Sequence, residues 1–255
     1  MDTRALLDAY DTQVRQAPHV GNDAYAVERE GTIVRVVRGG WGGVVYSALD
    51  EHTADAAIAA QVERFAGHEE DWEWKHYSYD TPADLPARLE AAGFVADEQE
   101  TVLVAEVAAL DTSLDPPAGV ELREITSEAE VLTLVALGDE VFGSPGPGAD
   151  TLLNGLGQEP RGMAALMAFA EGEPVAGGRV EFDAGSEFAG MWGGFTHERW
   201  RGRGIFRALV AHGAALARAR GYRYLHVDAA DTSLPILLRA GFVELAKTTP
   251  YKLVR

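Results

Sequence analysis

Cysteine is absent from this sequence of 255 residues, so disulfide bonds, thiolate metal sites and a catalytic thiol are all excluded. Long apolar runs are missing as well, and none approaches the roughly 20 residues that a membrane-spanning helix needs. The first residues, 1–8, lack the basic start and apolar stretch of a secretory signal. We therefore expect a cytoplasmic protein that has no membrane partner.

Positive charge is scarce, with 22 lysines and arginines against 40 aspartates and glutamates. The formal net charge of −18 repels polyanions, so nucleic acid is not expected as a partner. An acidic surface favours cationic small molecules or basic peptides, although solubility alone also explains it. The apolar fraction of 47% is typical of a folded protein with a sizeable core.

Two short motifs occur twice in the same order, which indicates a duplicated unit. Trp-Gly-Gly at 41–43 returns at 192–194, about 150 residues later. Ala-Gly-Phe-Val at 92–95 returns at 240–243 with nearly the same offset. Agreement in order and spacing argues against chance and predicts two related halves.

A segment at 111–118 contains two prolines and two aspartates and interrupts the periodic pattern, as linkers do. We therefore expect one domain at 1–110 and a second at 119–255. The predicted fold class is α/β (α+β), with a mixed, mostly antiparallel sheet flanked by helices in each domain. The Gly- and Pro-rich loop at 143–148 is a candidate substrate lid.

Hydrophobic periodicity predicts the elements of both halves. In the first half we expect a helix to about residue 14, a hairpin at 24–45, a helix at 54–65, a strand at 72–79 and a helix before Gly93. In the second half we expect a strand at 120–125, helices at 127–142 and 150–156, and a hairpin at 164–182. A strand at 188–196, a helix at 205–220, a strand at 224–228, a helix at 234–240 and one or two strands at 242–253 should follow.

A turn rich in arginine and glycine, residues 199–206, joins a predicted strand to the long predicted helix after it. The first backbone N–H groups of a helix are unpaired and carry partial positive charge, so such a turn binds phosphate. Gly202 and Gly204 let the backbone fold around an anion without a Cβ in the way. Arg201 and Arg203 add positive charge in an otherwise acidic protein. A dinucleotide-binding Gly-x-Gly-x-x-Gly and a Gly-Lys-Ser/Thr loop are both missing.

This Arg-x-x-Gly-x-Gly pattern resembles the acetyl-CoA motif of the GCN5-related N-acetyltransferase (GNAT) family. The resemblance covers residues 119–255 and includes the entering strand, the long helix and a closing Gly-Phe turn. It implies two GNAT-like domains of which the first is degenerate, acetyl-CoA as co-substrate and no metal. It also implies that the backbone of Gly202, Arg203, Gly204, Ile205 and Phe206 holds the pyrophosphate, and that strand residues Gly194, Phe195 and Thr196 pair with the pantetheine arm.

The catalytic residues depart from the family pattern. Many members carry a tyrosine four residues before the Gly-Phe glycine, where it protonates the leaving thiolate, but this chain has Leu237 there. Ser233 is a candidate for contacting the cofactor or the thiol, with a helix cap as the alternative. Glu181 is the preferred general base for taking a proton from the amine, and Glu187 and His197 are alternatives. Trp192 is expected in the core, with a place in the acceptor pocket as the alternative.

The first half lacks the phosphate turn. Residues 47–53 stand at the corresponding place, contain no glycine and carry two acids that repel phosphate. We therefore expect this half to pack against the catalytic half without holding CoA. The aromatic and acidic stretch at 69–74 is a candidate site for a cationic substrate, with a solvated helix end followed by a strand as the alternative.

The sequence thus predicts an acetyl-CoA-dependent N-acetyltransferase that acts on the primary amine of a small molecule or peptide by direct attack. A CoA-binding sensor or scaffold without turnover is the alternative, because the general acid is missing. A polyamine, an aminoglycoside, an amino acid and a protein N-terminus all remain open as acceptors, and so does the oligomeric state.

Overall fold

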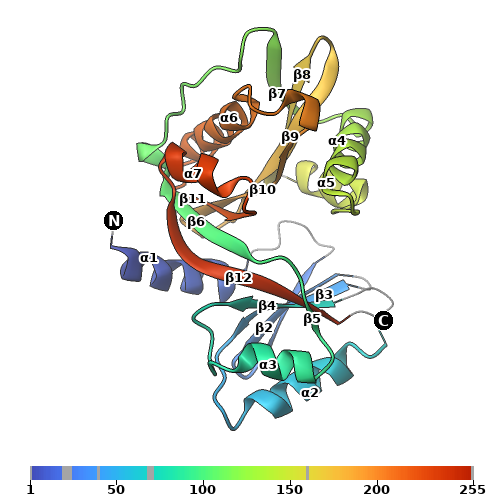
Figure 1. The fold of residues 1–255 in the computed structure, drawn as a ribbon, viewed down its shortest axis with the longest axis vertical. Helices are drawn as coiled ribbons and strands as arrows, with labels where there is room; N and C mark the ends of the chain where they lie inside the picture. The colour runs from blue at the N-terminus through green and yellow to red at the C-terminus, as the bar shows by residue number, and fades with distance from the viewer. Residues whose placement is uncertain (1, 19–24, 39–40, 68–71, 159–160, 254–255) are drawn as a thin grey trace. The chain divides into compact units, whose positions relative to one another are not determined.

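The computed structural model shows a chain of two compact units (Figure 1). It describes residues 2–18, 25–38, 41–67, 72–158 and 161–253. The units do not follow the order of the chain. The first consists of Met1–Leu103, Asp228–Leu234 and Glu244–Arg255, and the second of Val104–Val227 and Pro235–Val243. The domains expected at 1–110 and 119–255 are continuous segments of the sequence, whereas each of these units combines separate segments. The expected domain bounds stay a prediction.

In the first unit, neighbouring strands follow the order β1-β2-β3-β4-β12, with β5 beside β12. β3 and β4 run parallel, whereas β1-β2, β2-β3 and β4-β12 are antiparallel. The predicted hairpin at 24–45 is a three-stranded meander, because Gly31, with a φ of 58°, closes an additional turn between β1 and β2. The elements are α1 (Thr3–Tyr10), a π-helical turn (Asp11–Arg15), β1 (Ala26–Glu30), β2 (Ile33–Arg38), β3 (Trp41–Ser47), α2 (Ala54–Arg64), β4 (Trp72–Tyr77), α3 (Leu85–Ala91) and β5 (Val95–Ala96).

The last strand of the chain, β12 (Val243–Leu253), completes the first unit. Its residues from Thr248 to Leu253 pair with β4, with Thr248 opposite Tyr77 and Leu253 opposite Trp72. Side chains reinforce the pairing, since the Thr248 hydroxyl donates to the His76 carbonyl at 3.0 Å. The predicted final strand therefore exists, and its partner strand lies far away in the sequence.

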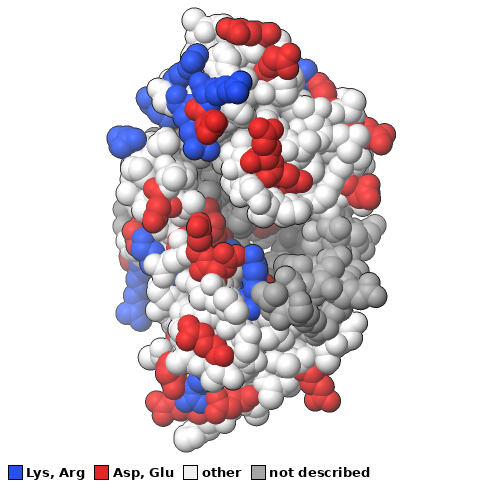
Figure 2. Space-filling model, turned by 45° about the vertical axis from the view of Figure 1, so that its right-hand side comes forward, with Lys and Arg blue, Asp and Glu red and all other residues white. Residues whose placement is uncertain are grey.

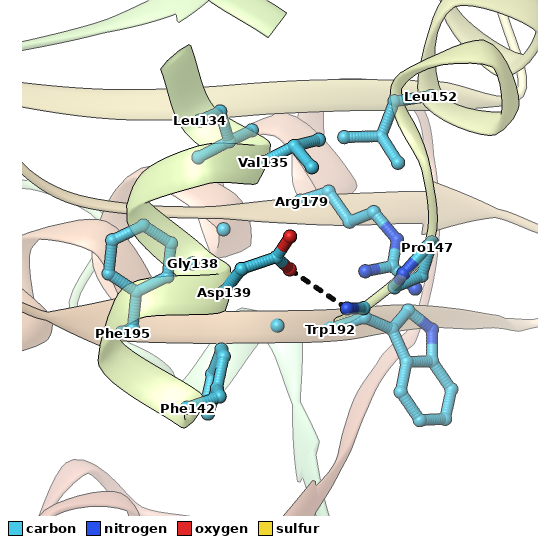
Figure 3. Close-up of a pocket in the computed structure, with 13 residues that line it drawn as sticks. Leu134, Val135, Gly138, Asp139, Phe142, Pro147, Leu152, Arg179, Trp192 and Phe195 are labelled. Carbon is cyan, nitrogen blue, oxygen red and sulfur yellow. Dashed lines mark hydrogen bonds between the residues drawn. The ribbon is translucent and has the colours of Figure 1, made fainter. Parts of the chain in front are cut away.

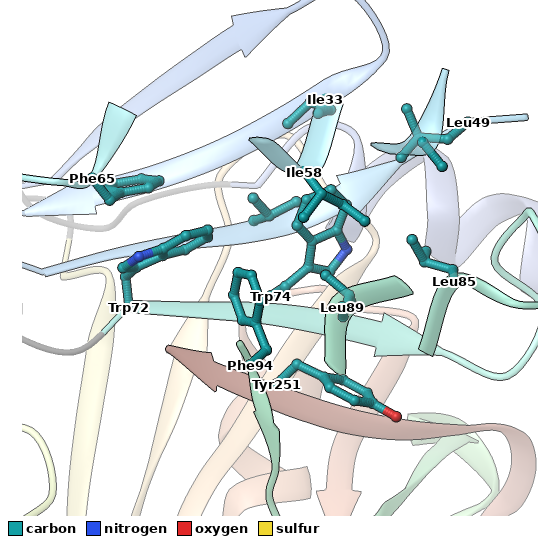
Figure 4. Close-up of a cluster of buried hydrophobic side chains, with 12 residues drawn as sticks. Ile33, Leu49, Ile58, Phe65, Trp72, Trp74, Leu85, Leu89, Phe94 and Tyr251 are labelled. Atoms are coloured by element: carbon teal, nitrogen blue, oxygen red, sulfur yellow. The ribbon is translucent and has the colours of Figure 1, made fainter. Parts of the chain in front are cut away.

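The core of the first unit combines aliphatic side chains with a group of packed aromatic rings (Figure 4). Trp72 and Trp74 are fully buried, and Trp72 stacks on Phe65 with ring centroids 4.6 Å apart. Phe94 meets Trp72 edge-on at 4.8 Å. The two tryptophans of the 69–74 stretch therefore cannot hold a cation at the surface, so that hypothesis is wrong for them. Residues 69–71 lie outside the described residues.

In the second unit, neighbouring strands follow the order β11-β10-β9-β8-β7. All described pairs are antiparallel except β10 with β11. Both units thus have the mixed, mostly antiparallel sheet that the sequence predicts. The elements are β6 (Glu100–Glu106, shared by the units), a 3-10 turn (Val107–Ala109), β7 (Val120–Ile125), α4 (Glu128–Phe142), α5 (Ala149–Leu156), β8 (Met163–Ala170), β9 (Glu173–Phe182), β10 (Phe188–Thr196), a 3-10 turn (Glu198–Trp200), α6 (Ile205–Ala219), β11 (Tyr224–Ala229) and α7 (Leu234–Ala240).

Helices cover both faces of this second sheet (Figure 1). Leu134 of α4 packs against Gly177 of β9, where a Cβ would lie 2.3 Å from the leucine Cδ1. Three residues further along β9, Val180 faces Gly213 of α6 instead. Because side chains alternate along a strand, α4 and α6 lie on opposite faces. Odd-numbered β9 residues thus face α4.

The repeated Gly-Phe motif has the same structure in both halves. Gly93 and Gly241 have φ values of 96° and 107°, and each follows a short helix. Phe94 N–H donates to the Leu89 carbonyl, and Phe242 N–H to the Leu237 carbonyl, which is the Schellman pattern of a helix C-terminus. The repeat therefore serves a local structural need in each half, while the tandem duplication itself stays a prediction.

No helix in the described ranges combines the length and apolarity that a bilayer crossing requires.

Candidate acetyl-CoA and acceptor site

The arginine- and glycine-rich turn lies between β10 and α6. Gly202 and Gly204 have left-handed backbones, with φ of 75° and 88°, and Gly204 caps α6. A Cβ at Gly202 would meet nothing within 4 Å, so the conformation alone requires glycine. The turn has the backbone that the glycine spacing predicts.

The N–H groups of this turn point to an anion site. In the part of the chain that the structure describes, no backbone hydrogen bond uses the N–H groups of residues 202–206. Side chains hold the turn instead: Arg201 Nε donates to the Thr196 carbonyl at 3.0 Å, and the Arg203 guanidinium lies 4.4 Å from the centre of the Trp200 ring. Unpaired N–H groups at the positive end of a 15-residue helix suit a pyrophosphate.

Charge is unevenly spread over the face shown in Figure 2. Lysine and arginine side chains gather in the upper part of that view, whereas acidic side chains are scattered over the face. The arginines of the turn belong to an otherwise acidic chain with 40 acidic residues. Local positive charge attracts a phosphate ligand even where the net charge is negative.

β10 and β11 part beside this turn. Among the described residues their parallel pairing is limited to three positions, from Phe188 with Tyr224 to Gly190 with His226. β10 continues to Thr196, and its pairing with β9 is bulged between Trp192 and Phe195. Residues 194–196 therefore have a backbone edge that β11 does not use. The expected pairing of this edge with the pantetheine arm fits the geometry and stays a prediction.

One buried polar atom supports that fit. The Thr196 hydroxyl oxygen is buried and has no hydrogen-bond partner among the described residues, although the Thr196 carbonyl is bonded to Arg201. A buried hydroxyl without a partner is unfavourable, because it has lost its hydrogen bonds with water. A ligand that lies along β10 would supply the missing partner.

A cavity of ≈ 60 Å³ lies on the α4 face of the second sheet, next to the bulge of β10 (Figure 3). Its wall is mostly apolar, and two charged side chains, Asp139 and Arg179, enter it. Asp139 Oδ1 accepts from the Gly146 N–H at 2.9 Å, which fixes the loop after α4 against the cavity. The predicted lid segment, 143–148, thus contributes to the wall. The lining includes Leu134, Val135, Phe142, Pro147, Leu152, Trp192, Gly193 and Phe195.

Glu181 lies beside this cavity, on the same face of β9 as Arg179. Its Oε1 accepts from Arg179 Nε at 2.6 Å, and the side chain is 34% exposed. Across the strands, Gly190 stands opposite both Glu181 and His226. A Cβ at Gly190 would lie 2.4 Å from Trp192 Nε1 and 2.9 Å from His226 Nε2, so glycine leaves room for these rings to meet. Their centroids are 5.4 Å apart.

The other sequence candidates have structural partners. The Ser233 hydroxyl donates to the Ala230 carbonyl at 3.0 Å, as a residue in a helix-leading turn does. His197 accepts from Arg199 N–H at 3.3 Å and lies 3.6 Å from Glu140, so it supports the turn. Glu187 is exposed and forms an ion pair with Arg223. None of these three belongs to the described cavity wall.

Asp183, a carboxyl group near Glu181, should make the stability of the protein depend on pH. Burial, followed by repulsion from Glu181, raises the pKa of Asp183 from 3.8 to about 7. The folded protein holds this proton more tightly than the unfolded chain, so stability is lost as the pH rises from about 4 through about 7. Asparagine cannot lose a proton, so the free energy of unfolding of Asp183→Asn should fall by about 2 kcal/mol less than that of wild type over this pH range. This value allows for partial exposure of the carboxyl group to solvent.

Urea unfolding of wild type and Asp183→Asn at several pH values between 4 and 8 measures this difference. The variant should gain on the wild type as the pH rises. Parallel stability curves for the two proteins would contradict a raised pKa at Asp183.

Residues 133–242 match the model of the Acetyltransferase (GNAT) family. This part of the chain is similar to a GNAT domain. The match contains α6, the arginine- and glycine-rich turn, the bulged β10 and the described cavity wall. It points to acetyltransferase activity.

Solved structures share the GNAT fold over nearly the whole chain. A GCN5-related N-acetyltransferase from Kribbella flavida is 16% identical, with 98% of this chain and 95% of that chain covered at a TM-score of 0.71. A tandem GNAT protein from the clavulanic acid biosynthesis pathway is 15% identical, with coverages of 98% and 94% and a TM-score of 0.65. A third, from Sphaerobacter thermophilus, is 18% identical, with coverages of 87% and 76% and a TM-score of 0.61. No curated protein sequence matches this chain.

The polar residues of the cavity, Arg179 and Asp139, belong to no motif in the sequence. Trp192, expected in the core with the acceptor pocket as the alternative, lines the cavity half-buried. The period of two along β9 would have placed Arg179 on the face of Glu181. No sequence signal shows that α4 brings Asp139 opposite that face.

Proposed function

We propose that the chain is an acetyl-CoA-dependent N-acetyltransferase that transfers an acetyl group to a primary amine. The observation that carries this proposal is the continuity of the site: a glycine turn with unpaired N–H groups, an unused strand edge before it, and a cavity beside that edge. Gly202 to Phe206 would hold the pyrophosphate, with Arg201 and Arg203 adding charge. Gly194, Phe195 and Thr196 would align the pantetheine arm.

The reaction is a direct displacement. Bound acetyl-CoA supplies the acetyl group as a thioester. The deprotonated amine attacks the carbonyl carbon, a C–N bond forms, the C–S bond breaks, and the thiolate leaves with a proton from solvent or protein. Backbone N–H groups of β10 would stabilise the oxyanion, and no covalent bond to the protein is needed.

Proton removal from the amine is assigned to Glu181. One of its oxygens is bound to Arg179, and the other has no hydrogen-bond partner among the described residues. Ser233 would act on the thiol side, where its hydroxyl would have to leave the Ala230 carbonyl.

We propose a cytoplasmic location, no nucleic-acid or membrane partner, and no metal in the reaction.

The second candidate function is a CoA-binding sensor or scaffold, favoured by the buried Leu237 at the usual position of the general acid. A thiolate is a good leaving group, so a missing acid does not abolish transfer. Incubation with acetyl-CoA and a panel of primary amines separates the two. The enzyme releases free thiol and yields an N-acetylated product detectable by mass, whereas tight binding of acetyl-CoA without thiol release for any amine favours the sensor.

Glu181→Gln tests the assigned base. We expect kcat to fall by about 100-fold, because general base catalysis contributes at least that much, while acetyl-CoA affinity stays unchanged. Glu173→Gln is the matched control: it changes an exposed glutamate at the other end of β9 and should leave turnover within about twofold of wild type. Equal turnover of the two variants would remove Glu181 from the mechanism.

A further inference from the structure

Arg179 has unused hydrogen-bonding capacity inside the cavity. Its side chain is only 17% exposed, and Nε is bound to Glu181. A guanidinium carries five N–H donors in one plane, and the four on the two Nη atoms have no hydrogen-bond partner among the described residues. Half-buried charged donors favour a ligand that brings acceptor oxygens.

The geometry of the guanidinium selects a planar anion. With Nε bound to Glu181, the edge formed by Nη1 and Nη2 is left, and this edge matches the two oxygens of a carboxylate. Glu181 fixes the orientation of that edge. Nη1 also lies near the β10 bulge, 3.1 Å from the position of a Cβ at Gly193.

Asp139 provides the opposite charge. Its Oδ1 is bound to Gly146 N–H, and its Oδ2 has no partner in the described part of the chain. Figure 3 shows Asp139 entering from α4 and Arg179 from β9, so that one negatively charged and one positively charged side chain face the same cavity. A zwitterion satisfies both groups, and because it is neutral overall, the acidic protein surface does not repel it.

The size and polarity of the cavity complete the argument. A volume of ≈ 60 Å³ holds roughly four to six water-sized atoms, enough for a carboxylate and its neighbouring carbon. Leu134 and Leu152 supply an apolar wall, and the 56% exposed Phe142 extends it outward. A polyamine would bring only N–H donors and further positive charge to Arg179.

We propose that the acceptor is a small α-amino acid with an apolar side chain. Its carboxylate is bound by the Nη edge of Arg179, its positive charge is balanced by Asp139, and Glu181 takes the proton from its amine. This inference rests on the proposed function for the chemistry of transfer. The recognition of the carboxylate can be measured without turnover.

Three ligands of one carbon skeleton test the proposal: L-leucine, 3-methylbutylamine, which lacks the carboxylate, and 4-methylpentanoic acid, which lacks the amine. Binding is followed by ligand-observed NMR with wild type, Arg179→Gln and Arg179→Lys. We expect L-leucine and 4-methylpentanoic acid to bind wild type about 10- to 100-fold more tightly than the amine. Arg179→Gln should abolish this preference, and Arg179→Lys should retain part of it, because lysine keeps the charge and loses the fork.

Arg239→Gln, which removes an exposed arginine on α7, is the control and should bind like wild type. Calorimetry with acetyl-CoA verifies that each variant keeps its fold and its cofactor site. The inference is overturned if wild type binds none of the three ligands, if it binds the amine as tightly as L-leucine, or if Arg179→Gln keeps the preference.

Thiol release with the same ligands separates the two proposals. Faster transfer to L-leucine than to 3-methylbutylamine supports both. Equal transfer to both amines supports the acetyltransferase and overturns the carboxylate site. Carboxylate binding that depends on Arg179, with no thiol release from any amine, supports the site and overturns the acetyltransferase.

Discussion

Acetyl-CoA affinity is expected to fall by about 1,000-fold or more when Gly202 and Gly204 are both replaced by aspartate. Both positions have positive φ, and the turn they form leaves the N–H groups of residues 202–206 unpaired. Two carboxylates would occupy this positive helix end and repel the pyrophosphate. Titration calorimetry of acetyl-CoA into wild type and variant measures the loss.

The control must carry the same backbone strain at another place. Gly172 and Gly185 also have left-handed backbones, with φ of 85° and 82°, and a Cβ on either meets nothing within 4 Å. The double variant Gly172→Asp/Gly185→Asp should therefore lose similar stability and keep its affinity for acetyl-CoA. If both double variants lose binding equally, the loss reflects strain or net charge, and the turn is not the anion site.

Arg15→Ala is expected to destabilise the first unit by about 3–5 kcal/mol. Arg15 is buried, its Nη2 donates to both oxygens of Asp80 at 2.8 and 3.0 Å, and its Nη1 donates to Asp11 at 2.9 Å and to the Tyr79 hydroxyl at 3.0 Å. The guanidinium also lies 3.7 Å from the centre of the Tyr77 ring. Removal of the arginine leaves the Asp80 carboxylate, 3% exposed, without its charge partner. Urea unfolding followed by tryptophan fluorescence reports the change, since Trp72 and Trp74 lie in this unit.

Two further variants sharpen this prediction. Arg64→Ala removes an ion pair with Glu28 in which both side chains are partly exposed, and it should lose less than about 1 kcal/mol. The double variant Arg15→Met/Asp80→Leu removes both buried charges and should recover more than half of the loss. A loss below about 1 kcal/mol for Arg15→Ala would mean that water reaches Asp80 and that the ion pair contributes little.

Local pattern was sufficient to predict most elements of this fold. The hairpin at 164–182 is β8 with β9, because Glu171 and Gly172 both take positive φ in the two-residue turn. Ser127 caps α4, with a hydrogen bond from Glu130 N–H at 3.4 Å. These features depend on neighbours in the sequence, which is why the sequence reveals them.

Long-range pairing could not be predicted in the same way. β12 looks like the final strand of the second half, yet it lies in the first unit and pairs with β4. Its alternation of residues fits either neighbour, and nothing in the periodicity specifies which edge it joins. The tryptophans of β4 show the same limit: next to acidic residues they suggest a surface site, but the pleat turns both inward.

One part of the candidate site could be predicted from the sequence, and the other part could not. The turn at 199–206 is a continuous segment, so its glycines and arginines stand out in the sequence. The cavity joins Asp139 of α4 to Arg179 of β9 and Trp192 of β10, residues up to about 50 positions apart whose types are ordinary. Their meaning appears only when the elements are packed together.

Acetyl-CoA is expected to bind this chain at one site, the glycine turn between β10 and α6. Calorimetric titration of acetyl-CoA into the wild-type protein, with the number of sites per chain as the measured quantity, tests it most directly. The account predicts one site per chain with micromolar affinity, since the first half has no glycine turn at 47–53. Two sites per chain, or no binding to the folded protein, would contradict it.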